Sequence, residues 1–207
     1  MLDFTHEDLS AEEVERLRSI YGPLTESVRR LVDATIRTET DADTVAAAKS
    51  RIDEATAALR GKQLDGAFGV RFTAHGDRMP WGNAVIGLRN PIAPPLAVRR
   101  ADDGSVSADF VLGAPYEGPP GHVHGGIAAL ILDHVLGEAA SPATSPRLTG
   151  TISVRYLRPT PLGALRAEAA IVRTEGIKTF AAGTISDGSG PTVQAEGVFI
   201  QPRWARG

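Results

Sequence analysis

Residues 125–140 read GGIAALILDHVLGEAA, and this stretch decides the fold. It predicts a helix with apolar side chains on nearly every side, and such a helix belongs in the interior of a protein. A single carboxylate, Asp133, interrupts the apolar run. A carboxylate among aliphatic side chains loses hydration free energy unless it is paired or borders a cavity. We therefore expect a buried central helix on which Asp133 is a functional group.

The segments around this helix predict antiparallel strands. Beyond Pro146 the apolar residues recur with a period of two, and short Gly-rich turns separate the runs. Ahead of the helix, a hairpin is expected over 96–112, because Asp103-Gly104 is a strong turn signal; one further strand is expected near 84–89. The expected fold class is α+β, with an antiparallel β-sheet wrapped around a long central helix and an α-helical N-terminal extension. The last four strands are expected to form a meander: 149–156, 165–173, 178–186 and 192–200.

The first 60 residues differ in composition from the rest. They carry 13 acidic and 8 basic residues, and only one of the 14 prolines. Helices are predicted over 11–20, 24–38 and 44–60; Ser10 and Glu13 form a capping box for the first of them, and Pro23 is expected to separate the first two. We interpret 1–60 as a helical extension that packs on the main domain, 61–82 as a linker and 83–207 as that domain.

Composition excludes several function classes. The 207 residues include no cysteine, which rules out disulfides, thiol catalysis and cysteine-bound metals. The net charge of −3 offers no surface typical of nucleic-acid binding, and the longest apolar run, 127–132, is far short of the ~20 residues of a membrane span. The polar N-terminus has no signal-peptide pattern. We therefore expect a cytoplasmic protein without a nucleic-acid or membrane partner.

Two glycines and Asp133 are the main candidates for chemistry. The N–H groups at a helix N-terminus are unpaired, and Gly125 and Gly126 allow a ligand oxygen to approach them closely, as an oxyanion requires; alternatively, the glycines only permit a tight turn. Gly125 and Asp133 are eight residues apart, or ~12 Å along a helix. Two antiparallel copies of the helix would bring Gly125 of one chain near Asp133 of the other, which predicts a site shared by a dimer.

The histidines near this helix have simpler explanations. His122 lies in a loop rich in Pro and Gly, where a solvent-exposed or backbone-bonded side chain is expected. His134 is expected to be an interior imidazole with satisfied hydrogen bonds. Zinc can bind imidazole and carboxylate groups, but the spacing of His122, His124 and Asp133 matches no metal motif, so no metal is expected.

The stretch from His124 to Asp133, HGGIAALILD, resembles the HGG…D signature of PaaI-type hotdog-fold acyl-CoA thioesterases of the 4-hydroxybenzoyl-CoA thioesterase superfamily. Thr149 follows sixteen residues after Asp133 and begins TGTISVRYLRPTPLG, which looks like the family's next strand with its Arg-Pro ending. The resemblance covers residues 83–200, is particularly close to the THEM4/THEM5-like branch, and leaves out the first 60 residues.

The resemblance implies hydrolysis of an acyl-CoA thioester at a dimer interface. Asp133 would then be the general base or the nucleophile, and the Gly125 N–H would polarise the thioester carbonyl. His124 would shape the oxyanion pocket, and Thr149 would hold the water or the carboxylate. No cofactor is implied, because coenzyme A is part of the substrate. The implied assembly is a homodimer with its sheets paired edge to edge, and a dimer of dimers is left open.

Substrate contacts are less specific in the sequence. Gly126, beside the oxyanion donor, and Arg158, among the cations available to the CoA phosphates, are the candidate substrate-binding residues. Ile127, Leu130 and Tyr156 either line an acyl tunnel or belong to the core. Two other classes remain as alternatives: a non-catalytic module that binds acyl-CoA, and a hotdog hydratase or dehydratase, whose His-and-carboxylate motif is absent.

Overall fold

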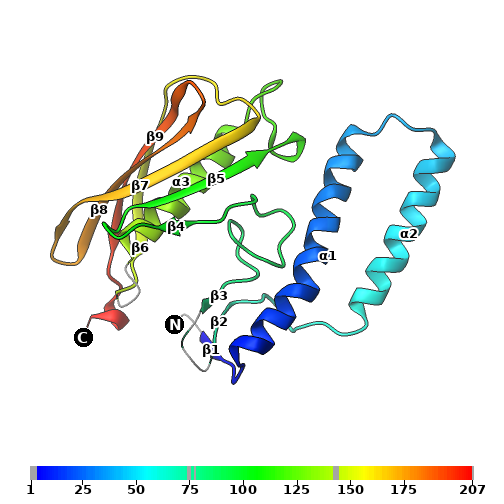
Figure 1. Ribbon diagram of the computed structural model, residues 1–207, viewed down its shortest axis with the longest axis horizontal. Helices are drawn as coiled ribbons and strands as arrows, with labels where there is room; N and C mark the ends of the chain where they lie inside the picture. The colour runs from blue at the N-terminus through cyan, green and yellow to red at the C-terminus, as the bar shows by residue number, and fades with distance from the viewer. Residues whose placement is uncertain (1–3, 74–75, 77, 142–144, 207) are drawn as a thin grey trace. The chain divides into compact units, whose positions relative to one another are not determined.

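The computed structural model describes residues 4–73, 76, 78–141 and 145–206 (Figure 1). The chain forms two compact units. One contains Met1–Asn83 and Gly87–Pro91, and the other contains Ala84–Ile86 and Ile92–Gly207. The division expected from composition, at residues 60 and 82, stays a prediction.

The second unit is an antiparallel six-stranded sheet against one helix, α3 (Gly125–Ala140). The strands are arranged in the order β4-β5-β7-β8-β9-β6, and the long strands curve past α3 (Figure 1). This confirms the α+β hotdog fold. The strand bounds are β4 (Arg99–Arg100), β5 (Val106–Leu112), β6 (Leu148–Tyr156), β7 (Gly163–Glu175), β8 (Lys178–Asp187) and β9 (Gly190–Ile200), and the short 3₁₀ helices are η1 (Ala114–Tyr116) and η2 (Arg203–Ala205).

The core lies between α3 and the inner face of the sheet. Strand β5 alternates buried with less buried residues along its length, which is the pattern of a sheet with one covered face. Helix α3 contributes buried residues from each of its turns, as its uninterrupted apolar sequence predicts. The largest side chains with no more than 1% exposure in this core are Phe199, Leu112, Ile131, Leu132, Leu136 and Ile185.

The prediction of a four-strand meander is wrong for β6. Strands β7, β8 and β9 are sequential neighbours, but β6 pairs with β9 at the edge of the sheet and β7 pairs with β5. The connection over 157–162 is therefore a crossing along the end of the sheet instead of a hairpin turn. It is held by backbone hydrogen bonds from Val123 N to Thr160 O (2.8 Å) and from Leu162 N to Gly121 O (3.0 Å). The connection is about as short as a hairpin loop, so its length alone does not show that β6 and β7 are not paired.

The first unit contains two helices and a small sheet. The helices are α1 (Ala11–Arg37) and α2 (Ala42–Arg60), and the sheet has the order β1-β2-β3, with β1 parallel to β2. The predicted capping box is confirmed, since Ser10 N donates to Glu13 Oε2 and Glu13 N donates to Ser10 Oγ. The strands are β1 (Phe4–His6), β2 (Val70–Phe72) and β3 (Arg78–Met79), of which β2 and β3 lie where a linker was expected.

The predicted break at Pro23 is wrong, because α1 is one continuous helix with Pro23 inside it. Proline in a helix interior loses a hydrogen bond and costs about 3 kcal/mol. Packing on both sides of the proline offsets this cost: Thr25 is buried, and the Arg89 guanidinium lies 3.7 Å from the Tyr21 ring centroid. Tertiary contacts thus outweigh the local signal.

The strand expected near 84–89 is also absent, and the segment consists of turns. Gly87 N donates to Asn83 O (3.0 Å), and Arg89 N donates to Trp81 O (2.9 Å). A Cβ atom at Gly87 would lie 2.3 Å from Asn83 O, so the folded-back backbone requires glycine here. Among the described residues, no helix is long and apolar enough to cross a membrane.

Candidate active site at the N-terminus of α3

The His124 side chain caps the N-terminus of α3. Its Nδ1 accepts a hydrogen bond from Gly126 N (3.0 Å), and its carbonyl accepts one from Ile127 N (2.9 Å). Because Nδ1 accepts, a neutral His124 carries its proton on Nε2. The Gly126 N–H is therefore already used within the chain. The Gly125 N–H has no acceptor among the described residues, as is usual for the first turn of a helix.

Tyr156, the last residue of β6, covers the same turn. Its Oη donates a hydrogen bond to Gly125 O (2.9 Å), and a Cβ atom on Gly125 would lie 3.2 Å from the Tyr156 ring. The peptide between Gly125 and Gly126 is thus held at both ends, by Tyr156 at its carbonyl and by His124 at its N–H. This arrangement restrains the first turn of α3, in which the Gly125 N–H is free.

A pocket of about 520 Å³ opens beside this turn. Its volume falls within the range of small-molecule sites, and its surface is mostly apolar with a few polar groups. Gly125, Gly126, Tyr156 and Arg158 are among the residues that line it. The remaining lining residues are Pro119, His122, Val123, Ala128, Pro159 and Thr160.

Asp133 lies two turns further along α3 and is held by β6. Thr149 Oγ1 donates a hydrogen bond to Asp133 Oδ1 (2.9 Å). Within the described residues Oδ2 accepts no hydrogen bond, so it can bind a water molecule or a substrate group. Asp133 is half-buried and Thr149 is exposed, because both lie beside the open edge of the sheet. The single chain therefore does not enclose the carboxylate as the apolar helix sequence predicts.

A β-bulge at Gly150 turns Thr149 toward Asp133. Thr149 pairs with the buried Phe199 and Thr151 with Val198, so Gly150 is an extra residue in β6. Thr149 and Ile152 are three residues apart and would face opposite sides of a regular strand, whereas the bulge places both on the inner face. A Cβ atom at position 150 would lie 2.8 Å from Ile200 Cδ1 and 3.2 Å from Val198 O, so a larger residue would require the Ile200 side chain to move.

The other two histidines of the region have different environments. The His122 Nδ1 lies 2.8 Å from Pro120 O, which agrees with the expected backbone-bonded side chain. His134 is mostly buried, and burial lowers its pKa more than the nearby carboxylates of Glu138 and Asp133 raise it. Its Nε2 has no hydrogen-bond partner among the described residues, contrary to the expected satisfied imidazole. No group of three acidic or histidine side chains among the described residues could hold a metal ion.

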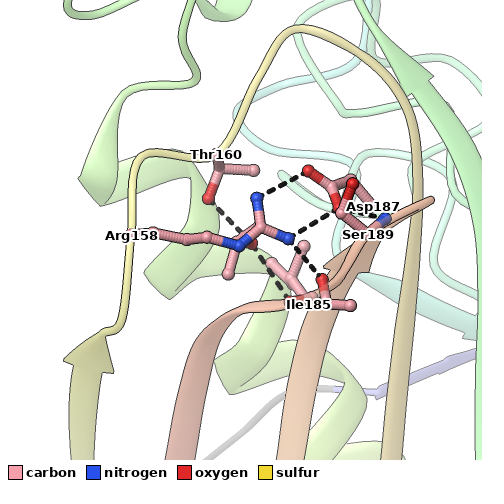
Figure 2. A network of polar contacts seen from close by, with 7 residues as sticks. Arg158, Thr160, Ile185, Asp187 and Ser189 are labelled. Carbon is pink, nitrogen blue, oxygen red and sulfur yellow. Dashed lines mark hydrogen bonds and ion pairs between the residues drawn. The ribbon is translucent and has the colours of Figure 1, made fainter.

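Arg158 has internal partners, as Figure 2 shows. Its Nη1 and Nη2 donate to the two carboxylate oxygens of Asp187 (2.7 and 2.6 Å), and Nη2 also donates to Gly190 O (2.7 Å). The guanidinium and the Ser189 N–H lower the pKa of Asp187 to about 2. Arg158 thus ties the start of the 157–162 crossing to the turn between β8 and β9, and its charge is neutralised there. Its predicted contact with substrate stays a prediction.

The structure brings the predicted residues together in two groups on one chain. Gly125, Gly126 and His124 share the helix N-terminus, and Thr149 of β6 meets Asp133 in the middle of α3. Strand β6 contacts both groups, with Thr149 at one end and Tyr156 at the other. The bond from Tyr156 to the Gly125 carbonyl was not predicted. The alternation of Ile152, Val154 and Tyr156 could have indicated that Tyr156 faces α3, but not which atom it would bind.

The sheet, the enclosed helix and the site at the helix N-terminus define a hotdog-fold protein. Comparisons with known proteins identify the family. The chain belongs to the thioesterase superfamily: the crystal structure of RHA08564, described as a thioesterase superfamily protein, is 34% identical, with a TM-score of 0.77 over 87% of this chain and 94% of that one. The model of the 4HBT family, described as thioesterase superfamily, matches residues 120–194.

Two further relatives cover smaller parts of the chain. Acyl-coenzyme A thioesterase THEM4 of Xenopus laevis is 34% identical over 91 residues, which are 42% of this chain and 41% of that protein. The chain thus spans about two-fifths of this curated relative. The PaaI protein of the Escherichia coli phenylacetic acid degradation operon is 16% identical, with a TM-score of 0.49 over 52% of this chain and 79% of that one. Two solved structures with TM-scores of 0.48 and 0.46 contain bound acetyl-CoA and CoA: smu.793 of Streptococcus mutans and BH2602 of Bacillus halodurans.

Proposed function

We propose that this protein hydrolyses an acyl-CoA thioester to the free acid and CoA. The observation that carries the proposal is the hydrogen bond from Thr149 to Asp133, which holds the Asp133 carboxylate of α3 against β6, the strand whose last residue, Tyr156, lines the pocket at Gly125. Membership of the thioesterase superfamily and the similarity to an acyl-CoA thioesterase support the same activity.

The proposed reaction uses residues of two chains. The thioester carbonyl oxygen accepts a hydrogen bond from the Gly125 N–H of one protomer. Asp133 of the other protomer removes a proton from water, and the water oxygen attacks the carbonyl carbon. The C–S bond then breaks, and the CoA sulfur receives the proton from Asp133. Direct attack by the Asp133 carboxylate, followed by hydrolysis of the anhydride, is the second route.

The dimer is required because one chain separates the two groups. Gly125 and Asp133 are two turns of α3 apart, or ~12 Å along the axis. A two-fold axis beside the unpaired edge of β6 would bring the partner's Asp133 toward Gly125 and would also cover the exposed Thr149. In this proposal, His124 positions the Gly125–Gly126 peptide, and Gly126 and Arg158 shape the substrate pocket.

Hydrolysis of a panel of short, long and aromatic acyl-CoA esters tests the activity, with the released thiol followed by a colorimetric reagent. General-base catalysis contributes about 10²–10⁴-fold, so Asp133→Asn should lower kcat by that factor while the fold is kept. Glu138→Gln is the matched control, because it removes a carboxylate from the same helix outside the proposed site.

Two results would contradict thioester hydrolysis. If wild-type protein binds CoA esters but releases no thiol from any of them, the non-catalytic binding module is supported. If an enoyl-CoA ester is hydrated without release of thiol, the protein is a hydratase. A near-normal rate in Asp133→Asn would leave the activity in place but remove Asp133 from the mechanism.

A further inference from the structure

Helix α2 carries an apolar stripe that no described element of its own unit covers. None of its side chains is buried, and the three large aliphatic residues Val45, Ile52 and Leu59 are 49%, 37% and 54% exposed. Among the described elements of its own unit, α2 makes no extensive contact with α1 or with the small sheet. Since most helix stability in proteins comes from packing of an apolar face, a 19-residue helix exposed on all sides lacks its main source of stability.

The large residues of the stripe are symmetrical about Ile52. Val45 precedes Ile52 by seven residues and Leu59 follows it by seven, while the small residues Ala48 and Ala55 lie four before and three after. At 3.6 residues per turn, these five positions share one face of the helix. An antiparallel copy of α2 presents the same order of large and small side chains in reverse. The face is therefore complementary to itself, as a two-fold interface requires.

The charged residues of α2 fit the same partner. Lys49 and Asp53 lie on one flank of the stripe and form an ion pair within the helix. In an antiparallel pair centred on Ile52, this flank of one helix faces the same flank of its partner. Lys49 of one copy and Asp53 of the other are then offset by only about 3 Å along the helix axis. The three acidic and three basic residues of α2 cancel, so two copies carry no net repulsion: Asp43, Asp53, Glu54, Lys49, Arg51 and Arg60.

We propose that α2 docks antiparallel on α2 of a second copy of this chain, with a two-fold axis close to Ile52. The helical extension is then an assembly surface with a defined partner. This inference stands independently of thioester hydrolysis, because it uses no residue of the proposed active site.

The absence of cysteine from the chain makes a direct test available. Ile52→Cys introduces a single thiol at the proposed axis, where the two Cα atoms would lie within disulfide range. Ser50→Cys places a thiol on the opposite face of the same helix, and both positions are exposed in the single chain. Under mild oxidation, Ile52→Cys should give a covalent dimer and Ser50→Cys should stay largely uncrosslinked. Equal or absent cross-linking in both variants would overturn the proposal.

Amide hydrogen exchange gives a second readout in reduced protein. Ile52→Glu should raise the exchange of α2 amides by about tenfold or more, while Ser50→Glu leaves it unchanged and the core strands β7–β9 stay protected in both. Unchanged α2 exchange in Ile52→Glu would contradict the pairing. If α2 exchange rises in Ile52→Glu but Ile52→Cys does not cross-link, something other than a second α2 covers the stripe, and the proposal is equally overturned.

Discussion

At the scale of single residues, Thr149 provides one hydrogen bond whose loss should affect rate more than fold. Hydrogen bonds to charged groups contribute about 1.5–3 kcal/mol, so Thr149→Val, which removes the hydroxyl and keeps the shape, should lower kcat about 10- to 100-fold. Thr149→Ser keeps the hydroxyl and should retain most of the activity. Steady-state kinetics with a hydrolysed acyl-CoA ester checks both. Equal losses in Val and Ser variants would assign Thr149 a packing role.

Gly125 is proposed to act through its backbone N–H. Its position at the start of α3 allows a substitution that removes this N–H without breaking the helix. It is the first residue of α3, where proline fits well, and His124 before it has the extended conformation that proline requires (φ −61°, ψ 131°). Gly125→Pro removes the N–H, whereas Gly125→Ala keeps it and adds only the Cβ atom that meets Tyr156.

Loss of one oxyanion donor costs about 10²–10³-fold in kcat, so Gly125→Pro should fall below Gly125→Ala by that factor. In both variants the added side chain displaces the Tyr156 ring. The difference in kcat between them therefore measures the contribution of the Gly125 N–H. Comparable kcat values in the two variants would exclude the Gly125 N–H as the oxyanion donor.

At the scale of elements, the pair of Arg158 and Asp187 should determine part of the acid stability. The pKa of Asp187 is lowered to about 2 in the folded chain, against about 3.9 in an unfolded one. The folded state therefore binds fewer protons between these values, and stability rises with pH across this window. The contribution is present above pH ~4 and is lost as the pH falls through about 2.

Asp187→Asn should flatten the dependence of Tm on pH between about 4 and 2, as measured by circular dichroism. Arg158→Gln should flatten it to a smaller extent, because the Ser189 N–H still stabilises the Asp187 carboxylate. If Arg158→Gln instead raises KM for acyl-CoA without changing acid stability, the arginine binds substrate and the ion pair is secondary.

Elements with a strong internal pattern could be predicted from sequence, and those set by contacts between segments could not. Helix α3 and strands β7–β9 show an unbroken period and short turns, so they were located almost to the residue. The pairing of β6 depends on the path of the 157–162 connection. The hydrophobic periodicity of the neighbouring strands does not indicate this path. The bulge at Gly150 appears in the sequence only as one glycine, and the continuity of α1 through Pro23 depends on packing around Tyr21 and Thr25.

The candidate site shows the same division. Gly125, Asp133 and Thr149 were predictable because their spacing matches a known motif on recognisable elements. The Tyr156 bond to the Gly125 carbonyl and the Asp187 partner of Arg158 arise from segments that meet only after folding. Arg158 illustrates the difference, since its charge indicated a phosphate contact and the structure surrounds it with acceptors of its own chain.

At the scale of the whole molecule, an active site shared between protomers predicts complementation between two inactive variants. In a heterodimer of Asp133→Asn with Gly125→Pro, one site receives both defects. The other site receives neither, because its glycine and its aspartate come from the unaltered positions of the two chains. Mixing the variants under conditions that exchange protomers should therefore restore activity, and random pairing would recover about a quarter of the wild-type rate.

A site contained in one chain gives the opposite result. Each site of the heterodimer would then keep one defect, and the mixture would be as inactive as its components. Mixing Asp133→Asn with Thr149→Val is the control, because these two residues contact each other within one chain and serve the same site. That mixture should gain nothing beyond the average of the two variants. Recovery in the first mixture and none in the second would show that Gly125 and Asp133 act across the interface.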